Sequence, residues 1–422
     1  MTTSSGDRGE AIVWSWLPDA TEPVPAGLLE VADGPLGSSI LTFAYATTYL
    51  AEAAAPPLYL PELPKNRGRQ EPGAGLDVHG VIRDGGPDSW GQRVVLRRLL
   101  GRETRHEDPG QIPLLTYLLE SGSNRPGALD FQRSRTDYVP REHAATLEEL
   151  MEAADRVQAG QTIPEHLEEA LTAGSSAGGA RPKATIADGD RQLIAKFSAA
   201  TDTYPVMKAE AVAMDLARRV GLDVSTTELV ELKGRPILLV DRFDRGPGGT
   251  RRQFVSALTI LGLSEIAGRY ATYHDLADVI RTRFPARRAT LKELFARIVF
   301  NILVSNTDDH ARNHAAFWNG DHLELTPAYD ICPQPRTGQT QSQAMAIGPD
   351  HRSSQVNTCV EHADIYELTV PEGRAIVDAQ IETIWAEWPE AADLARLTAT
   401  ERTAMWGHQV MNPYATYGYS GN

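Results

Sequence analysis

Short apolar runs bounded by turn residues are the clearest pattern in the middle of the chain. Residues 183–186 and 192–197 are joined around an Asp-Gly pair, and residues 226–232 and 236–240 around a Lys-Gly pair. Runs joined in this way predict β-hairpins. Between the two hairpins, residues 207–220 repeat apolar side chains at helical spacing. The predicted order is therefore two strands, a helix and two strands.

Helical periodicity dominates from residue 254 onward. The clearest predicted helices there are residues 274–284, 291–304 and 371–385. A strand-rich region followed by a helical one predicts two lobes. We expect the active site in the cleft between them, where lobed enzymes commonly bind their ligands.

The N-terminal third differs in composition. Pro-rich and Gly-rich passages at 54–75 and 83–87 precede a predicted helix at 89–100, and Gly127 predicts a turn into a short strand. We expect a separate module of mixed strands and helices. The expected domains are this module at residues 1–141, a strand-rich lobe at 142–250 and a helical lobe at 251–422.

The charge balance of the chain is acidic. Its 422 residues include 41% hydrophobic residues, enough for two or three cores, and its net charge is −15. Nucleic-acid binding needs a concentrated basic face, so direct DNA binding by this chain is not expected. For the one basic cluster, a solvated helix face is favoured over a binding patch. The cluster consists of Arg281, Arg283, Arg287, Arg288 and Lys292.

Cysteine usage and the apolar stretches bear on the compartment. Cys332 and Cys359 are too few for a disulfide framework and suit a reducing environment. Residues 1–16 lack the basic start and apolar stretch of a signal peptide. The apolar stretch 40–60 is interrupted by polar residues and a Pro-Pro pair, so no spanning helix is expected. We expect a cytoplasmic protein that makes no membrane contact.

Acids, amides and histidines gather in residues 301–318, at the end of an apolar helix. Phosphoryl transfer needs a carboxylate to accept the hydroxyl proton and further ligands to hold magnesium against the phosphates of ATP. Protein kinases use an Asp, an Asn five residues later and a downstream Asp. Asp308, Asn313 and Asp330 follow this order and spacing. The pattern predicts that Asp308 is the base and that Asn313 and Asp330 are magnesium ligands.

Plainer interpretations exist, because Asp and Asn often cap helices or close turns. Asp309 competes with Asp308 for the role of base, and only the five-residue step to Asn313 favours Asp308. His310 and His314, four residues apart, raise a transition-metal site as an alternative. We favour His310 as a residue that orients the loop or its carboxylates by hydrogen bonding.

Small residues make up most of the segment 175–183, SSAGGARPK, which we call the glycine-rich segment. Such a segment lets backbone amides approach phosphate oxygens. As a motif it is weak, and it is not a Walker sequence, because no Lys-Ser or Lys-Thr pair follows at the required spacing. A surface linker is the alternative. Its position just before the strand that contains Lys196 favours phosphate binding.

Lys196 is a lone charge in the apolar run 193–197, so it needs a partner or solvent. Pairing with nucleotide phosphates would satisfy it. Glu210, near the start of the following helix, is the natural carboxylate to hold the lysine in place. The alternative for Glu210 is a solvent-exposed acid that the helix dipole stabilises.

These motifs together resemble the HipA family, the serine/threonine kinase toxins of bacterial toxin–antitoxin pairs. The resemblance covers most of the chain; GGPDSWGQR at 85–93 and GALDF at 127–131 match the family's N-terminal module more loosely. The stretches that carry it are SSAGGARPKA at 175–184, LIAKF at 193–197, VDRFDR at 240–245, NTDDHARNH at 306–314 and YDICP at 329–333.

The resemblance implies a bilobal, protein-kinase-like α+β fold with a strand-rich N-lobe, a helical C-lobe and an N-terminal add-on module. It implies the same roles for Asp308, Asn313 and Asp330, and a hinge that contacts adenine around Asp241. Without the resemblance, Asp241 and Arg242 are equally well a strand-end ion pair. The residues expected to bind ATP are Ala177, Gly178, Gly179, Ala180, Lys183, Lys196, Asp241, Phe243 and His310.

The resemblance also implies self-inactivation, because members of the family phosphorylate a serine in their own glycine loop. Ser176 matches that serine best, and Ser175 beside it is the other candidate. A phosphate there cannot share a cradle with the phosphates of ATP, so the loop should be expelled. The plainer alternative is a small polar loop residue with no regulatory role.

The implied partners are a HipB-like helix-turn-helix antitoxin, through which alone DNA would be contacted, and a protein substrate. The family's substrates include aminoacyl-tRNA synthetases. Two other functions stay open: a catalytically silent ATP-binding co-repressor and a small-molecule phosphotransferase. The sequence departs from the common patterns at Asp309, where glycine is frequent, and at YDICP, which replaces the Asp-Phe-Gly of eukaryotic kinases.

Overall fold

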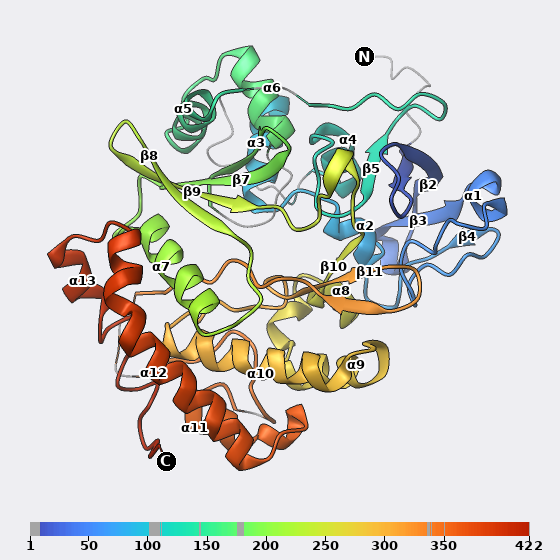
Figure 1. The fold of residues 1–422 in the computed structure, drawn as a ribbon. Coiled ribbons are helices and arrows are strands. Elements are labelled where there is room, and N and C mark those ends of the chain that lie inside the picture. The colour runs from blue at the N-terminus through green and yellow to red at the C-terminus, as the bar shows by residue number, and fades with distance from the viewer. Residues whose placement is uncertain are drawn as a thin grey trace. The chain divides into compact units, whose positions relative to one another are not determined.

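The computed structural model describes residues 9–100, 110, 112–142, 145–174, 181–335, 338, 340–349 and 351–421. Its contacts divide the chain into two compact units built from interleaved segments, whose elements are labelled in Figure 1. The first unit comprises the chain up to Ala200 together with Arg242–Val255 and Phe317–Asp321. The second comprises Thr201–Asp241, Ser256–Ala316 and the chain from His322 onward. The three-part division expected from the sequence stays a prediction.

An antiparallel five-stranded sheet forms the N-terminal part of the first unit, with strand order β4-β3-β2-β1-β5. The interior strand β1 is apolar almost throughout, and Val13 in it is fully buried opposite Phe131 of β5. Helix α4 packs on β1 and β5. The strands are β1 (Glu10–Trp16), β2 (Pro23–Asp33), β3 (Ser39–Tyr45), β4 (Arg69–Gln70) and β5 (Leu129–Gln132).

Two predicted elements of this unit are confirmed in detail. The hairpin of β6 (Lys183–Asp188) and β7 (Arg191–Phe197) turns at Gly189, whose φ of 58° suits glycine. The helix predicted at 89–100 is present as α3. Helices α5 and α6 pack against the hairpin. The helices of the unit are α1 (Thr47–Ala51), α2 (Gly80–Asp84), α3 (Ser89–Leu100), α4 (Leu114–Glu120), α5 (Leu147–Gln158) and α6 (Glu165–Gly174).

The second unit begins with helix α7 (Val206–Arg219) and the hairpin of β8 (Thr227–Leu232) and β9 (Arg235–Asp241), all as predicted. Positive φ angles at Lys233 and Gly234, 52° and 74°, allow the two-residue turn between the strands. Helix α10, which packs on α9, α11 and α12, forms the centre of the helical part, as Figure 1 shows. Its apolar residues are almost all fully buried.

Of the three helices predicted in this part, the first is shifted by one residue, and the other two were predicted with shorter bounds. Helix α10 starts at Arg287, before the apolar periodicity that located it, and α12 continues through Pro389 to Leu394. The elements are α9 (Tyr273–Arg283), α10 (Arg287–Leu303), α11 (Val356–Glu361), α12 (Val370–Leu394) and α13 (Ala399–Met405). Further short elements are β10 (Phe254–Ser256), α8 (Ala257–Ile260), β11 (Ala315–Trp318) and β12 (Leu323–Leu325). Of the helices that the structure describes, none is both long and apolar enough to cross a membrane.

Inside the first unit, a buried ionic cluster ties the segment around Gly127 to residues 242–245, the last four of the VDRFDR stretch. The Asp244 carboxylate accepts hydrogen bonds from the side chains of Arg242 and Arg245 and from the backbone N–H of Gly127. Arg242 also donates to the backbone carbonyls of Asn124 and Arg125. The cationic partners hold the pKa of Asp244 far below its ordinary value, although burial acts to raise it. The motif therefore has a structural role in this unit.

Substitution of Gly127 tests this junction. The residue has a φ of +76°, and a Cβ there would lie 3.1 Å from the backbone nitrogen of Phe254. Gly75 has a similar φ of +81°, but a Cβ there would have nothing within 4 Å, so it is the matched control. In both alanine variants the free energy of unfolding should fall by roughly 1–2 kcal/mol, because alanine is strained in the left-handed conformation. Gly127→Ala should lose on the order of 1–3 kcal/mol more, because its methyl group meets backbone. Urea unfolding measures both, and equal losses would contradict this account.

Candidate active site

The loop that holds most of the predicted catalytic residues begins where helix α10 ends. The N–H of Asn306 donates to the carbonyl of Asn301 at 2.8 Å, and that of Ser305 to Ile302 at 3.1 Å. Ser305 has a φ of 54°, so a serine occupies the left-handed position where glycine is common. This is the Schellman arrangement. It turns the chain out of the helix directly into residues 306–314.

The neighbouring residues Asp308 and Asp309 face different environments. Asp309 is only 3% exposed, whereas Asp308 is exposed. One carboxylate oxygen of Asp309 accepts hydrogen bonds from the Tyr273 hydroxyl, from Asn301 Nδ2 at 2.8 Å and from His314 Nε2 at 2.9 Å. Asn306 Nδ2 in turn donates to Asn301 Oδ1 at 3.0 Å. We call these five residues, Tyr273, Asn301, Asn306, Asp309 and His314, the Asp309 cluster.

The Asp309 cluster stabilises a buried negative charge. Burial acts to raise the pKa of Asp309, but His314 and the hydrogen bonds from His314 and Tyr273 bring that pKa below its ordinary value. Burial and the adjacent carboxylate raise the pKa of the Tyr273 hydroxyl well above its ordinary value, so it stays a donor. A carboxylate occupied in this way cannot approach a substrate hydroxyl. Of the two aspartates, Asp308 is the one placed to act as a base.

Asp308 interacts electrostatically with other predicted site residues. Partial burial raises the pKa of its carboxyl group, Asp330 and Asp309 raise it further, and His310 counteracts them. Asn313 Nδ2 donates to the Asp308 carbonyl at 3.2 Å, which leaves the amide oxygen of Asn313 as an acceptor.

Asp330 is brought to this loop by its neighbour. The Tyr329 hydroxyl donates to the Arg312 carbonyl at 2.7 Å, which ties the YDICP stretch to the residue before Asn313. Asp330 itself is partly exposed and has a φ of 59°, a left-handed conformation that few non-glycine residues adopt. Backbone strain of this kind is characteristic of functional sites. The second unit therefore brings Asp308, His310, Asn313 and Asp330 together.

The donor atoms of this group suit a hard divalent cation. Asp330 contributes a carboxylate and Asn313 an amide oxygen, the ligand types that Mg²⁺ prefers. Besides partial burial, repulsion between the carboxylates of Asp308 and Asp330 contributes to the raised pKa of Asp308, and a cation would relieve this repulsion. The transition-metal alternative has less support, because His314 points to Asp309. Within the described ranges, no three His, Cys, Asp or Glu side chains are grouped as metal ligands.

The residues expected to contact the nucleotide phosphates are described only in part. Lys183 and Lys196 are cross-strand partners in the β6–β7 hairpin of the first unit, and both are buried. Ser175, Ser176, Ala177, Gly178, Gly179 and Ala180 lie outside the described residues. Their roles in ATP binding and autophosphorylation stay predictions.

Glu210, Asp241 and Phe243 have defined surroundings in their own units. Glu210 in α7 is only 2% exposed, so the alternative of a solvent-exposed helix-start acid is wrong. A buried carboxylate requires a partner, which keeps its proposed role open. Asp241 is the last residue of β9. The Phe243 ring lies 6.2 Å from that of Phe254 and 5.7 Å from that of Phe317, centroid to centroid.

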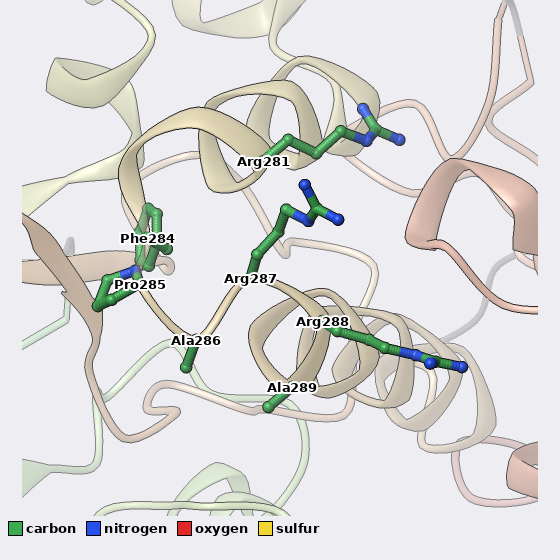
Figure 2. Close-up of a pocket in the computed structure, with 7 residues that line it drawn as sticks. All are labelled: Arg281, Phe284, Pro285, Ala286, Arg287, Arg288 and Ala289. Atoms are coloured by element: carbon green, nitrogen blue, oxygen red, sulfur yellow. The ribbon is translucent and has the colours of Figure 1, made fainter.

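The basic cluster lies at the junction of α9 and α10, where three of its members line a pocket (Figure 2). Figure 2 shows the side chains of Arg281, Arg287 and Arg288 extending away from Phe284 and Pro285. Each of these arginines has an acidic neighbour. Arg281 pairs with Asp278, Arg287 with Glu367 at 3.2 Å and Arg288 with Glu372 at 3.4 Å. Paired, solvent-facing arginines agree with the interpretation as a solvated helix face.

Sequence reasoning did not identify Tyr273, Asn301 and His314 as the residues that hold Asp309. The only sequence signal was the unusual density of acids, amides and histidines after the helix. Tyr273 lies 36 residues upstream of Asp309, so no local pattern connects them.

Adjacent substitutions test the division of roles between the two aspartates. Asp309→Asn should lower the free energy of unfolding by about 2–4 kcal/mol, because three buried donors lose an anionic acceptor. Asp308→Asn, at an exposed position, should have a free energy of unfolding within about 0.5 kcal/mol of that of the natural chain. Urea unfolding of both variants gives the comparison. Similar losses would show that the Asp309 cluster does not stabilise the fold as described.

The pH dependence provides a second test of the same charge. A carboxyl whose pKa is lowered by folding stabilises the folded state above its ordinary pKa, 3.8 here, and loses that contribution as the pH falls through the lowered value. The stability difference between the natural chain and Asp309→Asn should therefore be constant above about pH 5 and shrink below pH 4. If this stability difference instead grew toward acid pH, the claim that the fold stabilises the Asp309 carboxylate as an anion would be contradicted.

A family model matches the chain over residues 175–392, just over half of its length: the HipA-like C-terminal domain. Among curated relatives, a protein of Sinorhizobium fredii that is named a kinase is 32% identical over 147 residues. The serine/threonine-protein kinase toxin HipA of Shewanella oneidensis is 28% identical over 143 residues. These matches cover 33% and 29% of this chain, respectively, and 33% of each relative, so the chain spans about a third of their length.

Solved structures extend the similarity in fold. A chain of the Shewanella oneidensis MR-1 toxin–antitoxin complex of HipA, HipB and operator DNA superposes with a TM-score of 0.66 and 18% identity. The match covers 94% of this chain and 95% of the other. The expected α+β, kinase-like fold class is thereby confirmed. With the family model spanning residues 175–392 and this fold, the chain belongs to the HipA family.

Proposed function

We propose that the chain is a serine/threonine protein kinase that transfers the γ-phosphate of ATP to a protein hydroxyl, as a HipA-type toxin. The observation that supports this most directly is the arrangement around Asp308. Asp308 is an exposed residue, while the adjacent Asp309 is buried and fixes the loop against the helices. The oxygen donors of Asn313 and Asp330 lie on the same loop system. These are the parts that phosphoryl transfer requires.

Asp308 would accept the proton of the attacking hydroxyl. Partial burial and the neighbouring Asp330 and Asp309 raise the pKa of its carboxyl group, and a carboxylate with a raised pKa is a stronger proton acceptor. Asn313 and Asp330 would hold magnesium, which when bound neutralises charge on the phosphates of ATP. The hydrogen bond from Asn313 Nδ2 to the Asp308 carbonyl orients the amide so that its oxygen is the available ligand. His310 would help to orient this loop and the phosphates.

The remaining nucleotide contacts would come from the glycine-rich segment and the strands that follow it. Lys196 and Lys183 would contact the phosphates, with Glu210 holding Lys196 in place. Asp241 and Phe243 would lie beside the adenine. Support for these roles is the match of the family model from residue 175 onward.

Regulation would come from the kinase's own activity. Phosphate on Ser176, or on Ser175, would add nearly two negative charges where the phosphates of ATP must bind. The modified segment would then leave the site, and activity would cease.

The proposed partners follow from the family and the charge. The similar solved structure is a complex of HipA with HipB and operator DNA, which supports a HipB-like antitoxin for this chain. A net charge of −15 favours DNA contact through such a partner rather than directly. A cytoplasmic protein substrate, of which an aminoacyl-tRNA synthetase is the family's example, would complete the toxin function.

Incubation with magnesium and γ-labelled ATP tests the kinase chemistry. The natural chain should label itself, with peptide mapping placing the label on Ser176 or Ser175. Asp308→Asn should lower the labelling rate by about 10²–10⁴, because the proton acceptor is removed while folding is kept. Intact mass before the experiment excludes prior phosphorylation, and urea unfolding excludes misfolding of the variant.

The alternative functions give different results in the same experiment. An unmodified natural chain that binds ATP and the antitoxin but labels no polypeptide would support the silent co-repressor. ATP consumption on a small alcohol without polypeptide labelling would support a small-molecule phosphotransferase. Undiminished labelling by folded Asp308→Asn would refute the assignment of the base.

A further inference from the structure

Two buried lysines face the same side of the hairpin that follows the glycine-rich segment. Lys183 is the first residue of β6 and lies directly opposite Lys196 of β7 in the strand register. Directly opposite residues in an antiparallel pair have Cβ atoms about 4.5–5.5 Å apart, and like charges there destabilise the pair. Lys183 is 2% exposed and Lys196 is 8% exposed, so water cannot screen them well. The hairpin therefore requires an anion from elsewhere in the protein.

Asp88 of the N-terminal module supplies such an anion. Its Oδ2 atom lies 3.6 Å from the Lys183 ammonium, and the two side chains are 14% and 3% exposed. Its other oxygen, Oδ1, accepts the backbone N–H of Gly91 at 3.0 Å and so caps the first turn of α3. The position of the carboxylate is thus set by the helix. One side chain both starts α3 and neutralises Lys183.

The backbone of Lys183 is held from the same turn. Trp90, which is fully buried, donates its indole Nε1–H to the Lys183 carbonyl at 2.9 Å. In the same hairpin, the N–H of Phe197 donates to the carbonyl of Pro182 at 2.9 Å. The end of the glycine-rich segment is therefore fixed on one side by β7 and on the other by the N-terminal module.

We infer that Asp88 and Trp90 are positioning residues for ATP: they hold Lys183, and with it the C-terminal end of the glycine-rich segment, in the place where phosphates bind. The inference rests on the proposed kinase function and adds a role for the N-terminal module within it. Removal of the Asp88 charge takes away the carboxylate beside Lys183, so the repulsion between the two opposite lysines is less well compensated. Lys183 should then move, and residues 181–183, where the glycine-rich segment ends, should lose one of their fixed contacts.

Asp88→Asn is the informative variant, because asparagine caps a helix as well as aspartate does and α3 should persist. The dissociation constant for MgATP, measured by calorimetry, should rise about tenfold, the factor expected for loss of a charge-assisted contact. Asp88→Glu retains the charge and should recover part of this loss. The matched control is Asp188→Asn, which removes the exposed partner of Arg191 at the tip of the same hairpin. It should leave nucleotide affinity unchanged.

A double-substitution cycle separates positioning from a general loss of structure. In a Lys183→Met background, Asp88→Asn should cause no further loss of MgATP affinity, because there is no ammonium left to hold. Equal losses in both backgrounds would overturn the inference. Hydrogen exchange provides a readout that needs no nucleotide: backbone amides of residues 183–188 should exchange faster in Asp88→Asn and in Trp90→Phe than in the natural chain or Asp188→Asn.

Failure of the inference and failure of the proposed function are distinguishable. A natural chain that does not bind MgATP would count against the kinase, while faster exchange in the two variants would still support the structural contact. Unchanged exchange at residues 183–188 in both Asp88→Asn and Trp90→Phe would overturn the inference whatever the nucleotide result.

Discussion

The second unit is organised around one negative charge that has been removed from water. Asp309 is buried and accepts hydrogen bonds from Tyr273, Asn301 and His314, which come from helix α9, helix α10 and the far end of the loop. An isolated carboxylate in such a place would be strongly unfavourable, so the three donors and the charge depend on one another. This mutual dependence fixes the loop from Asn306 to His314 against the helices. The contacts of the buried Asp309 therefore also fix the positions of the exposed residues of that loop.

The same constraint governs the first unit. Its buried cationic side chains include Lys183 and Lys196 in the hairpin and Arg242 and Arg245 around the buried Asp244. Each requires an anion. Asp88, which is distant in sequence, lies beside Lys183, whereas Asp244 is close in sequence to its two arginines and accepts a hydrogen bond from the distant N–H of Gly127. Because an unpaired buried charge costs far more than an exposed one, these pairs specify which segments meet. The N-terminal module is thereby joined to the strands that follow the glycine-rich segment by ionic contacts as well as by apolar packing.

Sequence reasoning succeeded where the determining interactions are local. The turns at Gly189 and Gly234 and the helix over Ser89–Leu100 depend on neighbouring residues. It did not find Tyr273 as a partner of Asp309, because the two are 36 residues apart. Nor did it find Trp90 as a partner of Lys183, because these two are 93 residues apart. Nor could it resolve the pairing of β1 with β5, because strand register follows from burial of a whole face rather than from any turn. The ends of α10 and α12 were missed because polar first turns and an internal proline carry no apolar periodicity.

The surroundings of Asp309 explain how a second carboxylate is accommodated directly after Asp308. A second carboxylate beside Asp308 would compete for protons and cations if both faced the substrate. Here the side chain turns inward, where His314 and Tyr273 bring its pKa below the ordinary value against the effect of burial. Asp309 thus remains charged behind the loop, and that charge adds to the effects of burial and of Asp330 in raising the pKa of Asp308. A fixed negative charge close to a base increases the affinity of the base for a proton. The negative charge of Asp309 therefore favours protonation of the Asp308 carboxyl group, provided that the inward-facing donors are present with it.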